Sequence, residues 1–207
     1  MTRRQIAAGT VLHLAVTLWP WLLAPAGRVE TLVLFAIGAT ALFLGDATAP
    51  GGVRLQAPTA ADRRALGLAR AGSLTMLLAF WVGLASSGRV AVTGAWWGPW
   101  LGLAFMLAGA GLRHVAIRTL GPYFVTEVTP GSGHHLVRSG IYARLRHPSE
   151  IGLGAAMLGA ALVLDSAATL ATTIALALPL AYARIRLEEA ELARVHPDAA
   201  RAAAARS

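Results

Sequence analysis

Long apolar runs, separated by short polar stretches, dominate the chain. A helix needs about 20 apolar residues to cross the roughly 30 Å hydrocarbon layer of a membrane. Six runs reach or approach that length: 6–26, 30–47, 70–87, 90–112, 151–165 and 167–183. We therefore predict an all-α fold, a polytopic transmembrane helical bundle of about six spans. The fifth run is the shortest, so it either crosses by itself or forms a helical hairpin with the sixth that stops within the membrane.

The composition supports a membrane protein. Hydrophobic residues make up 56% of the 207 residues, and charged residues only 14%, which is typical of integral membrane proteins. The first run lacks the separate charged region and cleavage site of a signal peptide, so we expect it to be retained as a helix. Cysteine is absent, which excludes disulfide bonds, thiolate metal ligands and a cysteine nucleophile.

The basic residues, all of them arginine, indicate the orientation. If the N-terminus is cytoplasmic, 16 of the 18 basic residues lie on the cytoplasmic side, and only Arg28 and Arg89 lie in outside loops. This asymmetry is the positive-inside pattern of membrane proteins. We predict that both termini are cytoplasmic, in a bacterial-type inner membrane. The same pattern accounts for the net charge of +8, so we expect no nucleic-acid partner.

Small residues and loop residues indicate how the spans connect and pack. Segment 46–69 is rich in Ala, Gly and Pro, which predicts a cytoplasmic connector with a short helix that begins at Asp62 as its N-cap. Gly and Ala gather at 102–111 and at 152–161, which predicts close helix packing. Tryptophans near the span ends, such as Trp96, suit a membrane interface.

Charged residues are concentrated in 113–151, between the fourth and fifth runs. Turns are expected at 121–122 and 130–131, with extended chain between them. Pro148 disfavours the α conformation for His147 and is itself suited to the first position of a helix. The N-terminus of that helix carries unpaired amides and partial positive charge, so it favours a carboxylate or another anion.

A second polar stretch follows the sixth run. Glu188 and Glu189 lie one helical turn from Arg184 and Arg186. These side chains are either a solvated helix face, satisfied by their own arginines, or part of a site together with 113–151. Four histidines lie at 114, 134, 135 and 147, but they form no helical i, i+4 pair and no Glu-x-x-His motif, so we expect no metal.

Several motifs in this half of the chain agree with one family. The stretches GPYF at 121–124, HHLVRSGIYARLRHPSEIG at 134–152 and RIRLEEAEL at 184–192 resemble the C-terminal signature of isoprenylcysteine carboxyl methyltransferases and the related phospholipid methyltransferases. The resemblance covers about the last 100 residues. It divides the chain into N-terminal transmembrane helices, 1–112, and a C-terminal methyltransferase-like region, 113–207, with two further membrane helices and a cytoplasmic tail helix.

The resemblance implies an integral membrane methyltransferase that uses S-adenosyl-L-methionine, bound by a cytoplasmic segment. The acceptor it implies is a lipophilic small molecule or a lipidated group that enters from the bilayer among the membrane lipids, and the reaction it implies is carboxyl O-methylation. The catalytic residues would be Arg146, His147 and Glu150. The cofactor would contact His135, Leu136, Val137, Tyr142, His147, Pro148, Glu188 and Glu189.

Glu150 stands where the family usually has tyrosine, and this difference keeps other functions open. An acid at this position would repel a carboxylate acceptor, or it would take a proton from an amine or hydroxyl acceptor. A phospholipid or amine N-methyltransferase is therefore an alternative. A non-catalytic membrane scaffold or small transporter that retains the motif is another.

Overall fold

The computed structural model describes residues 10–11, 14, 29–48, 59–86, 91–121, 137 and 139–195. These residues form helices and no strands, which confirms the all-α prediction. Four helices are long and apolar enough to cross a membrane: α2 (Val29–Ala47), α3 (Ala60–Ser86), α4 (Gly98–Leu120) and the final helix over Ala167–Glu191. The chain is therefore an integral membrane protein. The predicted first span, 6–26, falls almost entirely outside the described residues.

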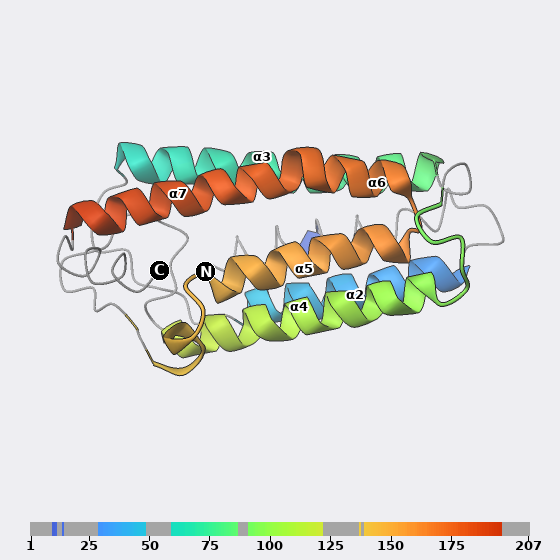
Figure 1. Ribbon diagram of the computed structural model, residues 1–207, viewed down its shortest axis with the longest axis horizontal. Coiled ribbons are helices and arrows are strands. Elements are labelled where there is room, and N and C mark those ends of the chain that lie inside the picture. Colours follow the sequence, from blue (N-terminus) through green and yellow to red (C-terminus); the bar gives the residue numbers. More distant parts are fainter. Residues whose placement is uncertain are drawn as a thin grey trace.

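The helices are arranged in two layers (Figure 1). One layer holds α3 and the final helix, which pack against each other along their length. The other holds α2, α4 and α5 (Pro148–Val163), with α4 between the other two in its packing. Helix α5 has 16 residues, so at 1.5 Å per residue it is about 24 Å long, which is shorter than the hydrocarbon layer. A short turn at 164–166 joins α5 to the final helix, but these two helices pack mainly on different partners.

The start of α3 corrects the prediction for the connector. The helix begins at Ala60 and runs without a break to Ser86, so the short helix expected in 46–69 and the span expected at 70–87 are one element. Its N-cap is Thr59 rather than Asp62. The Thr59 hydroxyl accepts a hydrogen bond from the Asp62 amide at 3.1 Å, and the Asp62 carboxylate accepts one from the Thr59 amide at 2.8 Å. This reciprocal pair is a capping box, which requires the acid three residues after the cap.

The start of α4 corrects a second boundary. The predicted span began at residue 90, but 91–97 is a loop and the helix begins at Gly98 with a proline in its first turn. The carboxylate of Asp165 holds this loop. It accepts hydrogen bonds from the backbone amides of Val92 at 3.0 Å, Thr93 at 2.8 Å and Gly94 at 3.2 Å. The loop amides are thus satisfied by a side chain 71 to 73 residues away in the chain. A hydropathy pattern does not reveal such a long-range contact.

Glycines bring α4 and α5 into close contact, as the small residues predicted. The two helices run antiparallel (Figure 1). A Cβ atom added at Gly152 would lie 2.5 Å from the Gly109 carbonyl oxygen, and one added at Gly159 would lie 2.6 Å from the Gly102 carbonyl oxygen. Larger side chains do not fit at either crossing, so the backbones themselves form this interface. The contact fixes the position of the α5 N-terminus relative to α4.

The final helix runs through the sixth predicted span and the polar helix predicted to continue it. Segments α6 (Ala167–Thr172), the π-helical turn η4 (Thr173–Ala177) and α7 (Leu178–Val195) follow one another without interruption. The sixth predicted span, 167–183, and the polar helix after it are therefore one rod. Its polar end projects past the apolar part of the bundle on the side where α4 ends and α5 begins (Figure 1).

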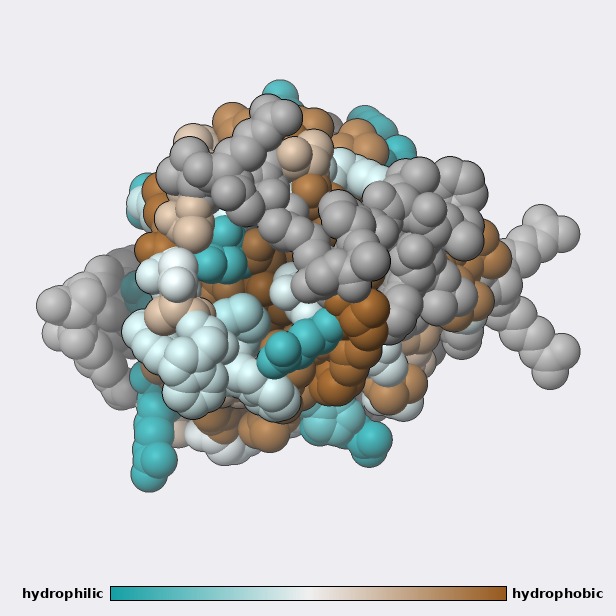
Figure 2. Space-filling model, turned by 90° about the vertical axis from the view of Figure 1, so that its right-hand side faces the viewer, coloured by the Kyte–Doolittle hydropathy of each residue, from teal (hydrophilic) through white to brown (hydrophobic). Residues whose placement is uncertain are grey.

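The apolar core joins the two layers near the opposite end. Leu34, Phe35, Phe80, Met106, Ala160, Val163 and Leu164 form one buried cluster. Phe35 from α2 stacks on Phe80 from α3, with ring centroids 4.5 Å apart. Figure 2 looks onto this end, where the coloured residues are mostly apolar or weakly polar, with a few hydrophilic ones. Trp96, Trp97 and Trp100 are exposed here, as expected for interfacial indoles.

Candidate functional site

The candidate site lies at the end of the bundle away from the apolar core. Three elements meet there: the short 3₁₀ helix η3 (Gly140–Ala143), the N-terminus of α5, and α7. Gly140 has a φ of +58°, which a glycine adopts without steric cost. The chain turns there and reaches α5 through His147 and Pro148. Pro148 is buried and occupies the first turn of α5, and His147 has φ −127° and ψ 58°, as the sequence predicted for a residue before proline.

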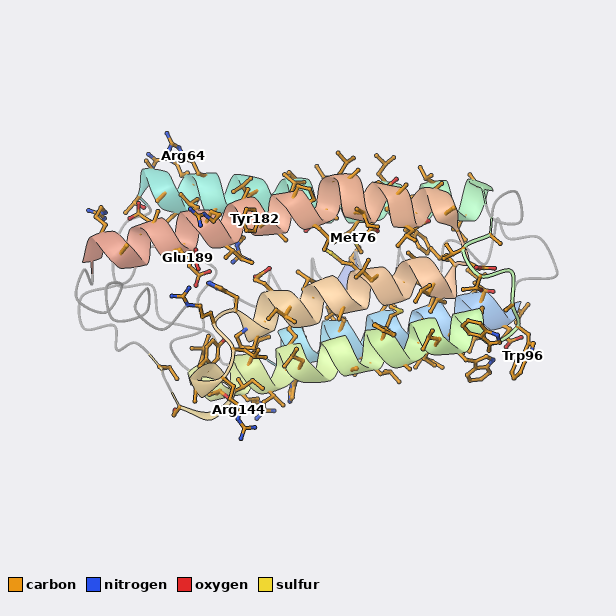
Figure 3. All side chains as sticks on the ribbon, viewed as in Figure 1. Arg64, Met76, Trp96, Arg144, Tyr182 and Glu189 are labelled. Atoms are coloured by element: carbon orange, nitrogen blue, oxygen red, sulfur yellow. The ribbon has the colours of Figure 1, made fainter. Side chains whose placement is uncertain are left out.

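Two side-chain contacts join the α5 N-terminus to α7. The His147 Nε2 atom lies 3.2 Å from the Glu189 Oε1 atom, and the Arg184 Nη1 atom donates to the Glu150 Oε1 atom at 2.8 Å. In Figure 3, Glu189 points from α7 across to the layer that contains α5. The two polar stretches, more than 30 residues apart in the chain, therefore fold against each other. They do not form a solvated face on α7 alone.

The second of these pairs is well shielded from water. The Glu150 side chain is 11% exposed and the Arg184 side chain 19%. The Arg184 Nε atom is also buried, and it has no hydrogen-bond partner among the described residues. The expected pairing within α7 is weak by comparison, since Arg186 lies 3.9 Å from Glu189 and is 66% exposed. A shielded pair depends strongly on both partners, because removing one leaves the other charge without compensation.

Tyr142 lies within electrostatic reach of the same carboxylates. Burial, together with the negative charges of Glu188 and Glu150, raises the pKa of its phenol to about 12, against a smaller opposing effect of Arg113. The phenol is therefore neutral at physiological pH. It offers a hydrogen-bond donor and an aromatic face beside an acidic surface.

A third network, centred on Arg113 of α4, holds the α5 N-terminus in place. The sequence analysis did not identify it as part of the site. Arg113 of α4 makes two hydrogen bonds to the Asp46 carboxylate of α2, from Nε at 2.7 Å and from Nη2 at 3.1 Å. Its Nη1 atom also donates to the Ser149 hydroxyl at 2.7 Å, in the first turn of α5. One feature of the sequence could have indicated this role: Arg113 directly follows an apolar run, where a charged side chain needs a partner.

The other sequence-predicted residues are placed as follows. His135 and Leu136 lie outside the described residues. Val137 is half-buried, and Arg146 is exposed at the turn before His147. The structure thus brings together Tyr142, His147, Pro148, Glu150, Glu188 and Glu189, with Arg184 as an added member. Among the described residues no three His, Asp or Glu side chains form a group that could hold a metal ion.

This arrangement is suited to a polar organic molecule more than to a bare ion. Carboxylates accept hydrogen bonds from hydroxyl and ammonium groups, while the first amides of α5, which no side chain caps, donate to an anionic group. The surface is thus acidic at α7 and electropositive at the α5 terminus. A molecule that carries a cationic part, hydroxyl groups and a carboxylate would complement both.

Comparisons with known proteins agree with the motifs. Residues 100–194 match the model of the isoprenylcysteine carboxyl methyltransferase (ICMT) family. The search of curated proteins found no match. The matched region begins inside α4 and contains η3, α5, all of α7 except its last residue, and both contacts between α5 and α7. The match confirms the resemblance drawn from the sequence: residues 100–194 of this chain are similar to the isoprenylcysteine carboxyl methyltransferase family.

Proposed function

We propose that this protein is a membrane methyltransferase that transfers the methyl group of S-adenosyl-L-methionine to a lipophilic or prenylated acceptor by carboxyl O-methylation. The observation that carries the proposal is the pair of contacts between the α5 N-terminus and α7, His147 with Glu189 at 3.2 Å and Glu150 with Arg184 at 2.8 Å. These contacts assemble the family's motif residues into one surface beside a membrane helix bundle.

The residues present fit the proposed cofactor by their chemistry. S-adenosyl-L-methionine supplies a methyl group activated by a sulfonium centre. The Glu188 and Glu189 carboxylates are suited to its ribose hydroxyls or its amino group, and their negative charge favours a cation nearby. Tyr142 and Val137 offer apolar surface, and Pro148 fixes the turn. His135 and Leu136, which precede Val137, complete the proposed cofactor set.

The contacts of Glu150 favour a carboxylate acceptor over an amine. An amine acceptor must lose a proton, and Glu150 was the candidate base, but its carboxylate is held by Arg184 at 2.8 Å in a shielded pair. A carboxylate acceptor needs no base, and the paired Arg184 offsets the charge of Glu150 that would repel it. His147 and the exposed Arg146 then serve to position the acceptor. Alignment of acceptor and methyl group can lower the activation barrier by on the order of 7 to 11 kcal/mol.

The proposed topology places this surface at the cytoplasmic side, with both termini cytoplasmic. The described arginines of α4, of the 143–147 turn and of α7 lie at the same end as the site, which follows the positive-inside pattern. A water-soluble cofactor then enters from the cytoplasm and a lipophilic acceptor from the bilayer.

A labelled-methyl experiment tests the proposal. Purified protein in lipid vesicles is incubated with a membrane lipid extract and methyl-labelled S-adenosyl-L-methionine, and the lipid fraction is counted. O-methylation gives label that mild base releases as methanol, whereas N-methylation gives label that base does not release. Glu189→Gln should abolish incorporation, and Glu191→Gln, an acid on the same helix that pairs only with Arg194 among the contacts described here, should retain it. Base-stable label favours the amine alternative, and no label with any extract contradicts the proposal.

A further inference from the structure

The final helix contains one turn that is not α-helical, between its apolar and its polar parts. Residues Thr173–Ala177 form a π-helical turn, and the Leu178 amide donates to the Thr173 carbonyl five residues earlier. A single such turn is equivalent to one extra residue inserted into an α-helix. Thr173 and Ala177 are buried, at 0% and 1% exposure, while the residues 174–176 between them are exposed.

Pro179 gives this turn a physical cause. A proline within a helix has no amide to donate, and its ring clashes with the carbonyl four residues earlier, which here belongs to Ala175. Widening the turn just before the proline moves that carbonyl away from the ring. The sequence LALPLAYARIR at 176–186 therefore specifies a local change in helical geometry five residues before Arg184.

The π-helical turn takes up one residue without the rotation of about 100° that each residue adds to an α-helix, since an α-helix has 3.6 residues per turn. In a regular α-helix of the same sequence, each side chain of α7 would therefore take the place of the residue one position after it. Arg184 would then occupy the place of Ile185. Ala183 would stand opposite Glu150, and the shielded Glu150 carboxylate would lose its partner.

We propose that the π-helical turn at Thr173–Ala177, with Pro179 as its positioning residue, sets the rotation of α7 so that Arg184 and Glu189 face the α5 N-terminus. The anchor for this rotation is upstream. Thr169 donates to the Ala79 carbonyl of α3 at 3.0 Å, which fixes the face of the helix before the turn. The rotation after the turn follows from the one residue that the π-helical turn takes up. The geometry stands by itself, and only its consequence for methyl transfer rests on the proposed function.

The test compares two helix registers by cross-linking. The chain contains no cysteine, so introduced cysteines are the only reactive thiols. The first variant, Pro179→Ala, removes the cause of the π-helical turn and keeps the number of residues. The second variant adds deletion of the exposed Ala175 to the first, which removes the residue that the turn takes up and restores, in a regular α-helix, the original rotation of Arg184 and of every residue after it. Each background receives either the pair Glu150→Cys with Arg184→Cys or the pair Glu150→Cys with Ala183→Cys.

A short dithiol-reactive cross-linker then reports which residue faces position 150. The parent and the second variant should cross-link 150 with 184, and the first variant should lose that product and gain the product between 150 and 183. The gain shows that the first variant is folded. The inference is overturned if the first variant still cross-links 150 with 184, or if the deletion of Ala175 fails to restore that product. Neither readout needs cofactor or acceptor, so failure of the proposed methyl transfer would leave this result interpretable.

Discussion

Removing Arg184 should destabilise the folded protein through the carboxylate it leaves behind. Glu150 is 11% exposed and its described partner is Arg184 at 2.8 Å. Breaking a buried ion pair by removing one partner costs about 3–5 kcal/mol. Arg184 retains 19% exposure and water can reach the pair in part, so we expect Arg184→Ala to lower the free energy of unfolding by about 3 kcal/mol, at the lower end of that range.

The assay is unfolding in mixed micelles, with helicity followed as the denaturing detergent fraction is raised. Replacing both partners by apolar residues, Glu150→Leu with Arg184→Met, should return the free energy of unfolding to within about 1 kcal/mol of the parent, because no charge is left unpaired. Arg194→Ala is the matched control, since that arginine is 67% exposed in an i, i+3 pair and should cost less than about 0.5 kcal/mol. Equal small losses for Arg184→Ala and Arg194→Ala, or a double variant that loses the sum of its two single changes, would refute the reasoning.

Three other changes have defined outcomes. Gly152→Ala should lower the free energy of unfolding by about 1–3 kcal/mol, because its Cβ would lie 2.5 Å from the Gly109 carbonyl oxygen, whereas Gly111→Ala, with open space around it, should be neutral or stabilising; equal effects in the same micelle assay would contradict the packing. The Tyr142 phenol should ionise near pH 12 rather than near 10, measured as the phenolate absorbance lost in Tyr142→Phe. Since the folded-state pKa is the higher one, the stability it contributes is complete below pH 10 and is lost as the pH rises through 12; a midpoint near 10 would show that the phenol is not shielded. Asp165→Ala removes the acceptor of three loop amides and should cost about 1–3 kcal/mol, with Asp165→Asn, which retains one oxygen, losing less; no difference from the parent would mean that the loop amides have other acceptors.

Local rules predicted the parts of the fold that depend on neighbours in sequence. Hydropathy located α2 almost to the residue, and Pro148 predicted both the start of α5 and the backbone of His147. The small residues predicted the α4 and α5 contact. The predicted helix boundaries failed where a distant or reciprocal side chain decides them, as with Asp165 at the loop before α4 and Thr59 at the start of α3.

The candidate site shows the same division. Motif spacing indicated that His147, Glu150, Glu188 and Glu189 belong together, but it left open whether Arg184 pairs within its own helix, and the structure pairs it with Glu150. Helical spacing could not reveal this, because the rotation of α7 depends on the π-helical turn before it. Arg113 was missed for a related reason, since its partners Asp46 and Ser149 come from two other helices.

Binding of S-adenosylhomocysteine, the product form of the proposed cofactor, tests the central claim most directly. Titration of the purified protein, followed by calorimetry in detergent, should show saturable binding at one site per chain. Glu189→Gln should weaken it at least about tenfold, the loss of roughly 1.4 kcal/mol expected for one hydrogen bond to a charged group, and Glu191→Gln should leave it unchanged. Saturable binding that Glu189→Gln leaves unchanged, or no binding at all, would contradict the assignment of this surface as the cofactor site.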